Sequence, residues 1–392
     1  MTVKKVLPLF LALIMLLPLL TFAVSSEKSE NVLPIASTDV LELDCESAVL
    51  MDAKTGTVLY EKSPDIALPP ASVTKIMTLL LVMEAIDSGV LSYTETVTAS
   101  AHASSMGGSQ IFLKEGEQMT VEDMLKSVVI ASANDAAVAL AEHIAGSEAA
   151  FVAKMNSRAA ELGMKITHFE NTNGLDDTAE NHVTSDRDIA IMSRELISHK
   201  EILKFSSIWM DTVRNGEFGL TNTNRLVRYY NGCTGLKTGS TSKAGFCISA
   251  TAERDGMSLI AVIMASPSRD ARNNAAKQLL DYGFSNYELF SPALTLPESV
   301  KIVGSAKESC KIKMQDFVCT LPRGKAKSVK AELTLNEKTK APVECGDCVG
   351  YVKFTLDGKE IGKAEILADE RAEKITYFQM IGKIIAFFLL KK

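Results

Sequence analysis

Residues 69–77 read Pro-Pro-Ala-Ser-Val-Thr-Lys-Ile-Met and place a serine and a lysine three positions apart at the start of an apolar run. The prolines favour extended backbone, and the apolar run predicts a helix from Ser72 to about Ser88. Positions three apart share one face of a helix, so the Lys75 amine can reach the Ser72 hydroxyl. A lysine desolvated beside apolar residues can stay neutral and accept the serine proton. The stretch therefore indicates a nucleophilic serine with a lysine base, at a helix N-terminus that can help hold an oxyanion.

One copy of this pattern would mean little, because serines at positions 25 and 240 also precede a lysine by three residues. Two further motifs follow in order, Ser132-Ala-Asn134 and Lys237-Thr-Gly239. A second Lys-Thr-Gly, at 54–56, comes before Ser72 and lies at a predicted hairpin bend, so it is interpreted as turn chemistry. The order and setting of the three motifs together indicate one active site.

The regions around these motifs predict an α+β domain. Alternating apolar patterns and turn residues predict strands at 47–52, 57–61, 234–239, 244–252 and 259–265. Helical periodicity and capping residues predict helices at 72–88, 124–130, 136–145, 149–162, 185–198 and 270–282. Two early strands, a helical middle and three late strands predict one antiparallel sheet formed by both ends of the region and covered by helices. Lys237 would then lie on an edge strand that lines a cleft.

Composition sets limits on function. The 392 residues carry a net charge of -6, with 46% hydrophobic and 23% charged residues, as in a globular protein of two or three domains. Sparse aromatic residues and the lack of a basic stripe argue against nucleic acid as a partner. The seven cysteines are scattered, and Cys345 and Cys348 lack the second pair that a zinc site needs, so buried or locally paired cysteines are expected near the C-terminus. The serine chemistry requires no cofactor, and none is expected.

Both ends of the chain contain apolar segments. Lys4 and Lys5 precede an apolar run, which predicts a secretory signal peptide over residues 1–25 and a polar linker over 26–41. An uncleaved membrane anchor is the alternative, and either interpretation predicts export. Residues 373–392 place apolar side chains at helical spacing between lysines, in a run shorter than the ~20 residues that span a bilayer. We expect an amphipathic helix in the membrane interface, with a spanning helix or burial against the preceding domain as alternatives.

Between these ends, the composition changes beyond the predicted catalytic region. From 291 to 372, short Val, Ile and Thr segments alternate with Lys and Glu turns. This pattern predicts a small β-sandwich-like domain with hairpin connections.

The three motifs resemble those of the active-site serine penicillin-recognising enzymes, and more closely the low-molecular-mass penicillin-binding proteins that act as D-alanyl-D-alanine carboxypeptidases. The similarity runs from about Ala48 to Phe284 and continues more loosely to the terminal helix. The other stretches that carry it are His182-Val-Thr-Ser-x-x-Asp188, Ala244-Gly-Phe and Leu279-Leu-Asp-Tyr-Gly-Phe284. The resemblance implies a β-lactamase/transpeptidase-like fold for a catalytic domain at 42–290.

The resemblance also implies a mechanism. Ser72 would attack the carbonyl between two D-alanines with Lys75 as its base, and water would then hydrolyse the acyl-enzyme. Ser132 would relay protons with Lys75, and Asn134 would hold the substrate amide. The backbone N–H groups of Ser72 and Ser240 would form the oxyanion hole, although many relatives carry histidine at the second position.

The expected substrate-binding residues are Asn134, Lys237, Thr238, Gly239, Ser240 and Arg272. Lys237 would bind the terminal carboxylate by charge and Thr238 by its hydroxyl. Arg272 matches the family's further cation by its spacing before Leu279, and Arg269 is the second candidate.

Two alternatives remain open. A serine β-lactamase uses the same motifs but needs a second base, and Glu170-Asn-Thr-Asn173 lacks the usual Glu-x-x-Leu-Asn pattern. A non-catalytic wall-binding protein would be expected to have lost a motif residue, and none is lost. The expected partners are peptidoglycan stem peptides ending in D-Ala-D-Ala, β-lactam antibiotics and a membrane surface. The expected location is the outer face of the cytoplasmic membrane, facing the cell wall.

Overall fold

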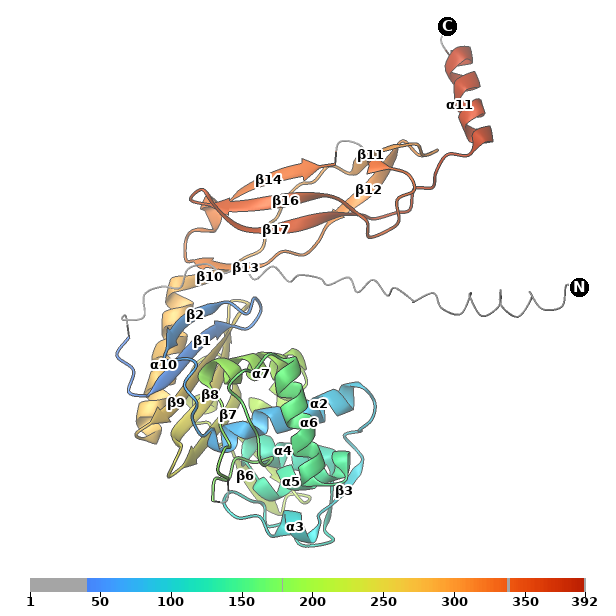
Figure 1. Ribbon diagram of the computed structural model, residues 1–392. Coiled ribbons are helices and arrows are strands. Elements are labelled where there is room, and N and C mark those ends of the chain that lie inside the picture. Colours follow the sequence, from blue (N-terminus) through green and yellow to red (C-terminus); the bar gives the residue numbers. More distant parts are fainter. Residues whose placement is uncertain (1–40, 178, 337–338, 391–392) are drawn as a thin grey trace, which may run out of the picture. The chain divides into compact units, whose positions relative to one another are not determined.

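The computed structural model describes residues 41–177, 179–336 and 339–390. The predicted signal peptide and residues 26–40 of the predicted linker lie outside the described residues. Within the described part, an α+β domain is followed along the chain by a β domain and a C-terminal helix (Figure 1).

One five-stranded antiparallel sheet forms the centre of the α+β domain. Its strand order is β2-β1-β9-β8-β7, so the first and last parts of the domain sequence meet in the same sheet. The strands are β1 (Ser47–Asp52), β2 (Val58–Lys62), β7 (Cys233–Thr241), β8 (Gly245–Arg254) and β9 (Met257–Ser266). The predicted sheet is confirmed, and β7, which carries Lys237, lies at its edge.

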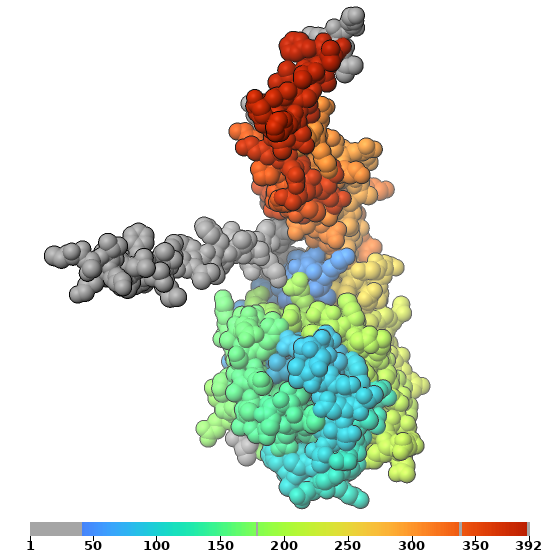
Figure 2. Space-filling view, turned by 90° about the vertical axis from the view of Figure 1, so that its right-hand side faces the viewer, coloured from blue at the N-terminus to red at the C-terminus, as the bar shows by residue number. Residues whose placement is uncertain are grey.

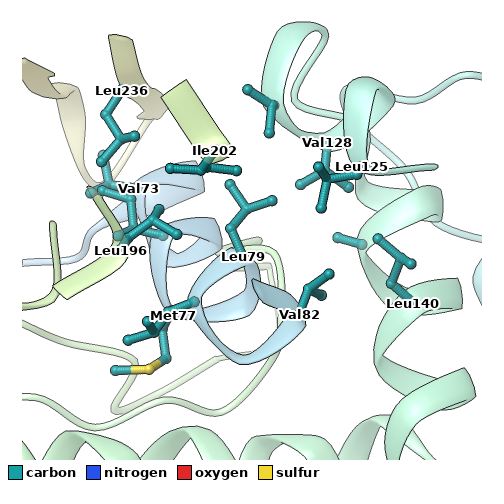
Figure 3. Packing of buried hydrophobic residues seen from close by; sticks show 14 of the residues in the cluster. Val73, Met77, Leu79, Val82, Leu125, Val128, Leu140, Leu196, Ile202 and Leu236 are labelled. Carbon is teal, nitrogen blue, oxygen red and sulfur yellow. The ribbon is translucent and has the colours of Figure 1, made fainter. Parts of the chain in front are cut away.

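Helices cover both faces of this sheet. On one face, α2 (Lys75–Asp87) lies at the centre of a layer whose other members are α3 (Ala101–Ser104), α4 (Val121–Ile130), α5 (Asn134–Ala145), α6 (Glu148–Glu161), α7 (Asp186–Ser198) and α8 (Ile202–Ser206). Figure 3 shows Leu79 and Val82 of α2 among side chains of α4, α5 and α7. Each such fully buried side chain contributes roughly 2 kcal/mol, so the apolar run after Ser72 anchors the nucleophile's position. On the other face, α10 (Arg269–Asn286) packs against β8 and β9.

The start of the predicted helix at 72–88 differs in the structure. Its first residues form a short 3-10 helix, η3 (Ala71–Thr74), and the α-helix begins at Lys75. A 3-10 turn is common where an α-helix starts. Small elements that the sequence pattern did not predict are α9 (Leu226–Tyr229) and the strand pairs β3 (Thr96–Thr98) with β4 (Gln118–Thr120) and β5 (Met210–Val213) with β6 (Phe218–Thr221).

The β domain has its own core. Its larger sheet has six strands in the order β14-β16-β17-β12-β11-β15, and β10 (Tyr287–Phe290) pairs with β13 (Cys319–Pro322). The six are β11 (Ser299–Val303), β12 (Ser309–Met314), β14 (Lys330–Leu335), β15 (Thr339–Lys340), β16 (Cys348–Leu356) and β17 (Lys359–Ala368). Phe317 stacks on the buried Phe354 with 4.4 Å between ring centroids. All seven cysteines are free; Cys310 and Cys319 are buried as expected, but Cys345 and Cys348 are exposed and unpaired.

The C-terminal helix is α11 (Tyr377–Leu390). Its apolar side chains are exposed, among them Phe378 at 83% and Phe388 at 73%. In the described part of the chain, no single helix is long and apolar enough to cross a membrane. Only α5 and α6, bent by 84°, pass that test of length and composition together.

Candidate active site

Ser72 and Lys75 lie where η3 meets α2. Ser72 is half-buried, and Lys75 is fully buried. Lys75 Nζ lies 2.8 Å from Ser72 Oγ and donates to the carbonyl oxygen of Asn173 at 2.8 Å. The spacing of three residues thus brings the amine to the hydroxyl, as the sequence predicted.

The environment of Lys75 favours its neutral form. Burial lowers the pKa of the Lys75 amine well below its usual range, and the positive charge of Lys237 lowers it further. The carboxylate of Asp135 opposes this shift only in part. A neutral amine has a lone pair that can accept the Ser72 proton, so Lys75 can act as the base.

Ser132 faces this pair from the connection between α4 and α5. It adopts φ 64°, and its Oγ accepts a hydrogen bond from Lys237 Nζ at 2.8 Å. The sequence predicted a proton relay between Ser132 and Lys75, but the hydrogen bond described for the Ser132 hydroxyl is to Lys237. The Lys237 side chain reaches Ser132 from the edge strand β7. Its amine also donates to the carbonyl of Thr238 at 2.8 Å.

A cleft of about 610 Å³ opens beside these residues. The residues that line it are Ser72, Ser109, Ser132, Trp209, Thr221, Asn222, Thr223, Arg225, Tyr229, Thr238, Gly239, Ser240, Arg269 and Arg272. Three of these described lining residues are arginines and none is acidic. The cleft therefore suits a substrate that carries a negative charge.

Thr238 and Arg272 can bind that charge. Thr238 Oγ1 donates to Thr223 Oγ1 at 2.9 Å. The Arg272 guanidinium is held by Asn273 Oδ1 at 2.9 and 3.1 Å, and burial lowers its pKa only to about 10, so it stays charged at neutral pH.

Lys237 was expected to bind the carboxylate by charge. It is 1% exposed and is not among the residues that line the cleft, so this role stays a prediction. Burial, together with the charge of Arg272, lowers the pKa of Lys237 to about 7. Among the described residues that line the cleft, Arg225, Arg269 and Arg272 supply the positive charge.

Asn134 is the first residue of α5 and is 3% exposed. Its Nδ2 donates to the carbonyl of Gly107 at 2.8 Å, whereas its Oδ1 is buried without a partner among the described residues. Asn134 is not among the lining residues of the cleft. A buried acceptor without a donor is costly, so this oxygen is left with unused capacity to accept a hydrogen bond, and the expected contact of Asn134 with the substrate amide stays a prediction.

Two glycines allow close packing around the nucleophile. A Cβ on Gly239 would lie 2.8 Å from the backbone nitrogen of Ser72, and a Cβ on Gly174 would lie 1.8 Å from the carbonyl oxygen of Ala71. The edge strand β7 and the loop at 171–175 therefore both pack closely against the backbone of Ala71 and Ser72. The close approach places the Ser72 N–H beside the end of β7, where the Ser240 N–H can complete an oxyanion hole.

His182 supports the same turn. Its Nδ1 accepts the backbone N–H of Glu170 at 3.0 Å, so the ring proton is on Nε2, which donates to Thr74 Oγ1 at 2.7 Å. Burial lowers the pKa of His182 to about 4, which keeps the ring neutral. The sequence pattern included His182 without assigning it this contact.

Several functional neighbours were missed by sequence reasoning. Asn173 could have been found, because the glycine of its loop indicates a close approach of the backbone. Trp209, Thr223 and Arg225 lie in a region with no motif and reach the cleft through tertiary packing. The interpretation of the second Lys-Thr-Gly as turn chemistry is confirmed, because Thr55 hydrogen-bonds Asp52 within the β1–β2 hairpin and does not line the cleft.

Glu170, the nearest candidate for a β-lactamase second base, is also placed elsewhere. Its carboxylate accepts the backbone N–H groups of Glu180 and Asn181. It does not line the cleft, so the described residues do not provide the carboxylate that rapid hydrolysis of a stable acyl-enzyme would need.

Comparisons with known proteins agree with this geometry. Residues 34–268 match the family described as D-alanyl-D-alanine carboxypeptidase, and residues 289–374 match the C-terminal domain of penicillin-binding protein 5. D-alanyl-D-alanine carboxypeptidase DacF of Bacillus subtilis is 39% identical over 373 residues, which are 93% of this chain and 94% of that protein.

Solved structures are similar as well. Penicillin-binding protein 5 of Haemophilus influenzae has a TM-score of 0.76 at 33% identity, covering 86% of this chain and all of that one. Penicillin-binding protein D2 of Listeria monocytogenes, solved in its ampicillin-bound form, has a TM-score of 0.58 at 33% identity, covering 62% of this chain and 99% of that one.

Proposed function

The chain belongs to the D-alanyl-D-alanine carboxypeptidase family of low-molecular-mass penicillin-binding proteins and is a serine carboxypeptidase, and we propose that it works through an acyl-enzyme on Ser72. Its proposed substrates are peptidoglycan pentapeptides, from which it releases the terminal D-alanine. The observation that carries the proposal is the buried Lys75 amine, whose pKa is lowered and which lies 2.8 Å from the Ser72 hydroxyl at the cleft.

Acylation uses the pair Ser72 and Lys75 together with the residues that bind the substrate carboxylate. Lys75 takes the proton of Ser72 Oγ, which attacks the carbonyl carbon between the two D-alanines. The oxyanion is stabilised by the N–H groups of Ser72 and Ser240. The C–N bond then breaks, the leaving amine receives the proton from Lys75, and D-alanine departs. Thr238 and Arg272 bind its carboxylate throughout and so align the scissile bond.

Deacylation restores the enzyme. Water attacks the ester, its proton passes to the neutral Lys75 amine, and Ser72 regains its hydroxyl. A penicillin would acylate Ser72 by the same attack, but its leaving amine stays covalently tethered after the ring opens. The tethered group would remain where water must enter, which would make the penicilloyl-enzyme long-lived. The ampicillin-bound Listeria protein supports this part of the proposal.

The location of the enzyme is part of the proposal. Export by the segment at 1–25 and attachment through α11 would place the cleft outside the cytoplasmic membrane, facing the wall. The apolar side chains of α11 support this, since eight of them are exposed: Tyr377, Phe378, Met380, Ile384, Ile385, Phe387, Phe388 and Leu389. Such a helix can bury its apolar side in a lipid interface.

Two measurements on the purified protein test the proposal. Incubation with a pentapeptide ending in D-Ala-D-Ala should release one D-alanine per peptide, and labelled penicillin should remain bound through denaturation. Rapid turnover of penicillin without D-alanine release would instead identify a β-lactamase. Absence of both reactions would contradict any catalytic function for the cleft.

A further inference from the structure

An exposed aromatic side chain in strained backbone lies near the cleft. Phe112 is 64% exposed and adopts φ 61°, in the left-handed region that bulky residues rarely enter. Figure 2 shows the segment around this residue, coloured teal, at the surface of the α+β domain. Strain that persists in a folded protein must be imposed by its surroundings, and such sites are often functional.

The surroundings that impose it are buried. The carboxylate of Asp135, which is fully buried, accepts the backbone N–H groups of Ile111 at 3.1 Å and Leu113 at 3.0 Å. Ile111 and Leu113 turn their side chains into the core. One carboxylate thus clamps the residues on both sides of Phe112 and directs the ring between them to solvent.

A second aromatic ring extends this exposed surface. Phe218 of β6 meets Phe112 edge-to-face, with ring centroids 6.3 Å apart. Arg214 lies over the Phe218 ring at 5.2 Å, pairs with Glu117 at 2.6 Å and donates to the carbonyl of Ile111 at 2.8 Å. The charge of Arg214 is therefore balanced by Glu117, and the half-buried Phe218 supports the exposed Phe112 ring, which is the apolar platform of this surface.

The platform lies close in sequence to residues that line the cleft. Ser109, three residues before Phe112, lines the cleft, and so does Thr221 at the end of the strand that carries Phe218. The surrounding exposed residues include Asn215 and Ser109, which can hydrogen-bond hydroxyl groups. An apolar centre with a polar rim matches a sugar ring, which has C–H groups on its faces and hydroxyls at its edge.

We propose that Phe112, supported by Phe218, forms a stacking subsite for the sugar that carries the stem peptide, a specificity element beyond the peptide cleft. The inference rests on the proposed function, because it assumes a peptidoglycan substrate. The four residues before the scissile bond cover up to about 14 Å when extended, and the three residues from Ser109 to Phe112 span at most about 11 Å. Since Ser72 and Ser109 line the same cleft, a peptide that runs from Ser72 past Ser109 would bring its sugar towards Phe112.

Two substrates test the subsite: a free pentapeptide, and the same pentapeptide attached to its N-acetylated disaccharide. The variant is Phe112→Gly, because glycine accepts the positive φ and should keep the melting temperature within about 3 °C of wild type. We expect kcat/KM for the disaccharide substrate to fall roughly 3- to 10-fold, mainly through KM, while the free peptide changes less than about twofold. Phe112→Tyr should retain wild-type values, and Val90→Ala, at another exposed apolar residue, is the matched control.

A binding measurement separates this proposal from the proposed function. In saturation-transfer NMR with a peptide-free N-acetylated tetrasaccharide, wild type and Phe112→Tyr should show sugar signals that Phe112→Gly lacks, even if no D-alanine is released from any peptide. Equal losses on both substrates would assign Phe112 to the peptide cleft or the fold, and no loss on either would leave the rings without a substrate role. Either result, or equal sugar signals in wild type and Phe112→Gly, overturns the subsite.

Discussion

Two buried lysines govern the chemistry at the scale of single residues. Burial lowers the pKa of both amines; the charge of Lys237 lowers that of Lys75 further, and the charge of Arg272 lowers that of Lys237. Arg272, Lys237 and Lys75 thus differ in how strongly they hold their protons. In the proposed mechanism, the Arg272 guanidinium stays charged to bind the substrate carboxylate, while the buried Lys75 amine, whose pKa is lowered, acts as the base.

The Ser72→Ala variant should lose both D-alanine release and covalent penicillin labelling. Only one hydroxyl is removed from a turn that is held by Gly174, Gly239 and the apolar residues of α2, so the fold should be retained. Mass spectrometry of the penicillin-treated variant and its circular dichroism spectrum provide the two measurements. A penicilloyl adduct on the folded variant would show that another residue is the nucleophile.

The Lys75→Ala variant should lose acylation by at least ~100-fold, because no other amine described in the structure lies on the Ser72 hydroxyl. Lys54→Ala is the matched control: it removes a lysine from the other Lys-Thr-Gly, is exposed, and should change kcat/KM less than about tenfold. The acylation rate with labelled penicillin checks both variants. Similar losses in the two would mean that the hairpin copy also contacts substrate.

The sequence predicted the motif residues of the active site better than it predicted the neighbouring residues that contact them. Ser72, Ser132 and Thr238 were found because short motifs record local spacing, and all three line the cleft. Trp209 and Arg225 were missed because they reach the cleft only through the path of the chain between α8 and β7. The bond from Lys237 to Ser132 was also missed, since a lysine four carbons long can reach several acceptors and only packing selects one.

At the scale of elements, the active site depends on a loop as much as on the helix that begins at Lys75. The sequence predicted the main strands and long helices within a few residues, because their apolar periodicity is strong. It did not predict that η3 precedes α2, because that turn is shaped by contact with Gly174 and Gly239, which are distant in sequence. Tertiary contacts of this kind leave no local pattern beyond the glycines themselves.

His182 should make stability depend on pH through this loop. Its pKa is lowered from the ordinary 6.5 to about 4, so the folded protein binds fewer protons than the unfolded chain between these values. The neutral ring therefore makes its full contribution to the free energy of unfolding above pH 6.5. This contribution falls by on the order of 2 to 3 kcal/mol as the pH falls toward 4. His182→Asn should be less stable at pH 7, where the Thr74 contact is lost, but its stability should change less over this range.

Urea unfolding at several pH values between 4 and 7 measures this effect as the difference between wild type and variant. His168→Asn is the control, because the His168 side chain is exposed, its ring contacts the carbonyl of Asn181, and its charge contributes less than burial to the lowered pKa of His182. It should keep the wild-type dependence on pH. If His182→Asn and wild type lose stability in parallel, the ring does not couple this loop to protonation.

At the scale of the whole molecule, the cleft and the helix proposed for membrane attachment occupy different parts of the chain. Every described residue that lines the cleft lies between Ser72 and Arg272. The β domain has a separate core around Val352 and Phe354, and α11 follows it along the chain. This division implies that the attachment of the enzyme can be changed without changing its chemistry.

Removal of all residues after Ala372 tests this division. The truncated, signal-cleaved protein should be soluble and should keep its activity on a small free pentapeptide, because no cleft residue is lost. It should no longer pellet with membranes and should act more slowly on wall polymer, where attachment raises the local concentration of enzyme. Fractionation with membranes, followed by both activity assays, decides between the possibilities. A truncated protein that still pellets would rule out α11 as the anchor, and one that is soluble but inactive or aggregated would mean that the helix belongs to the folded core.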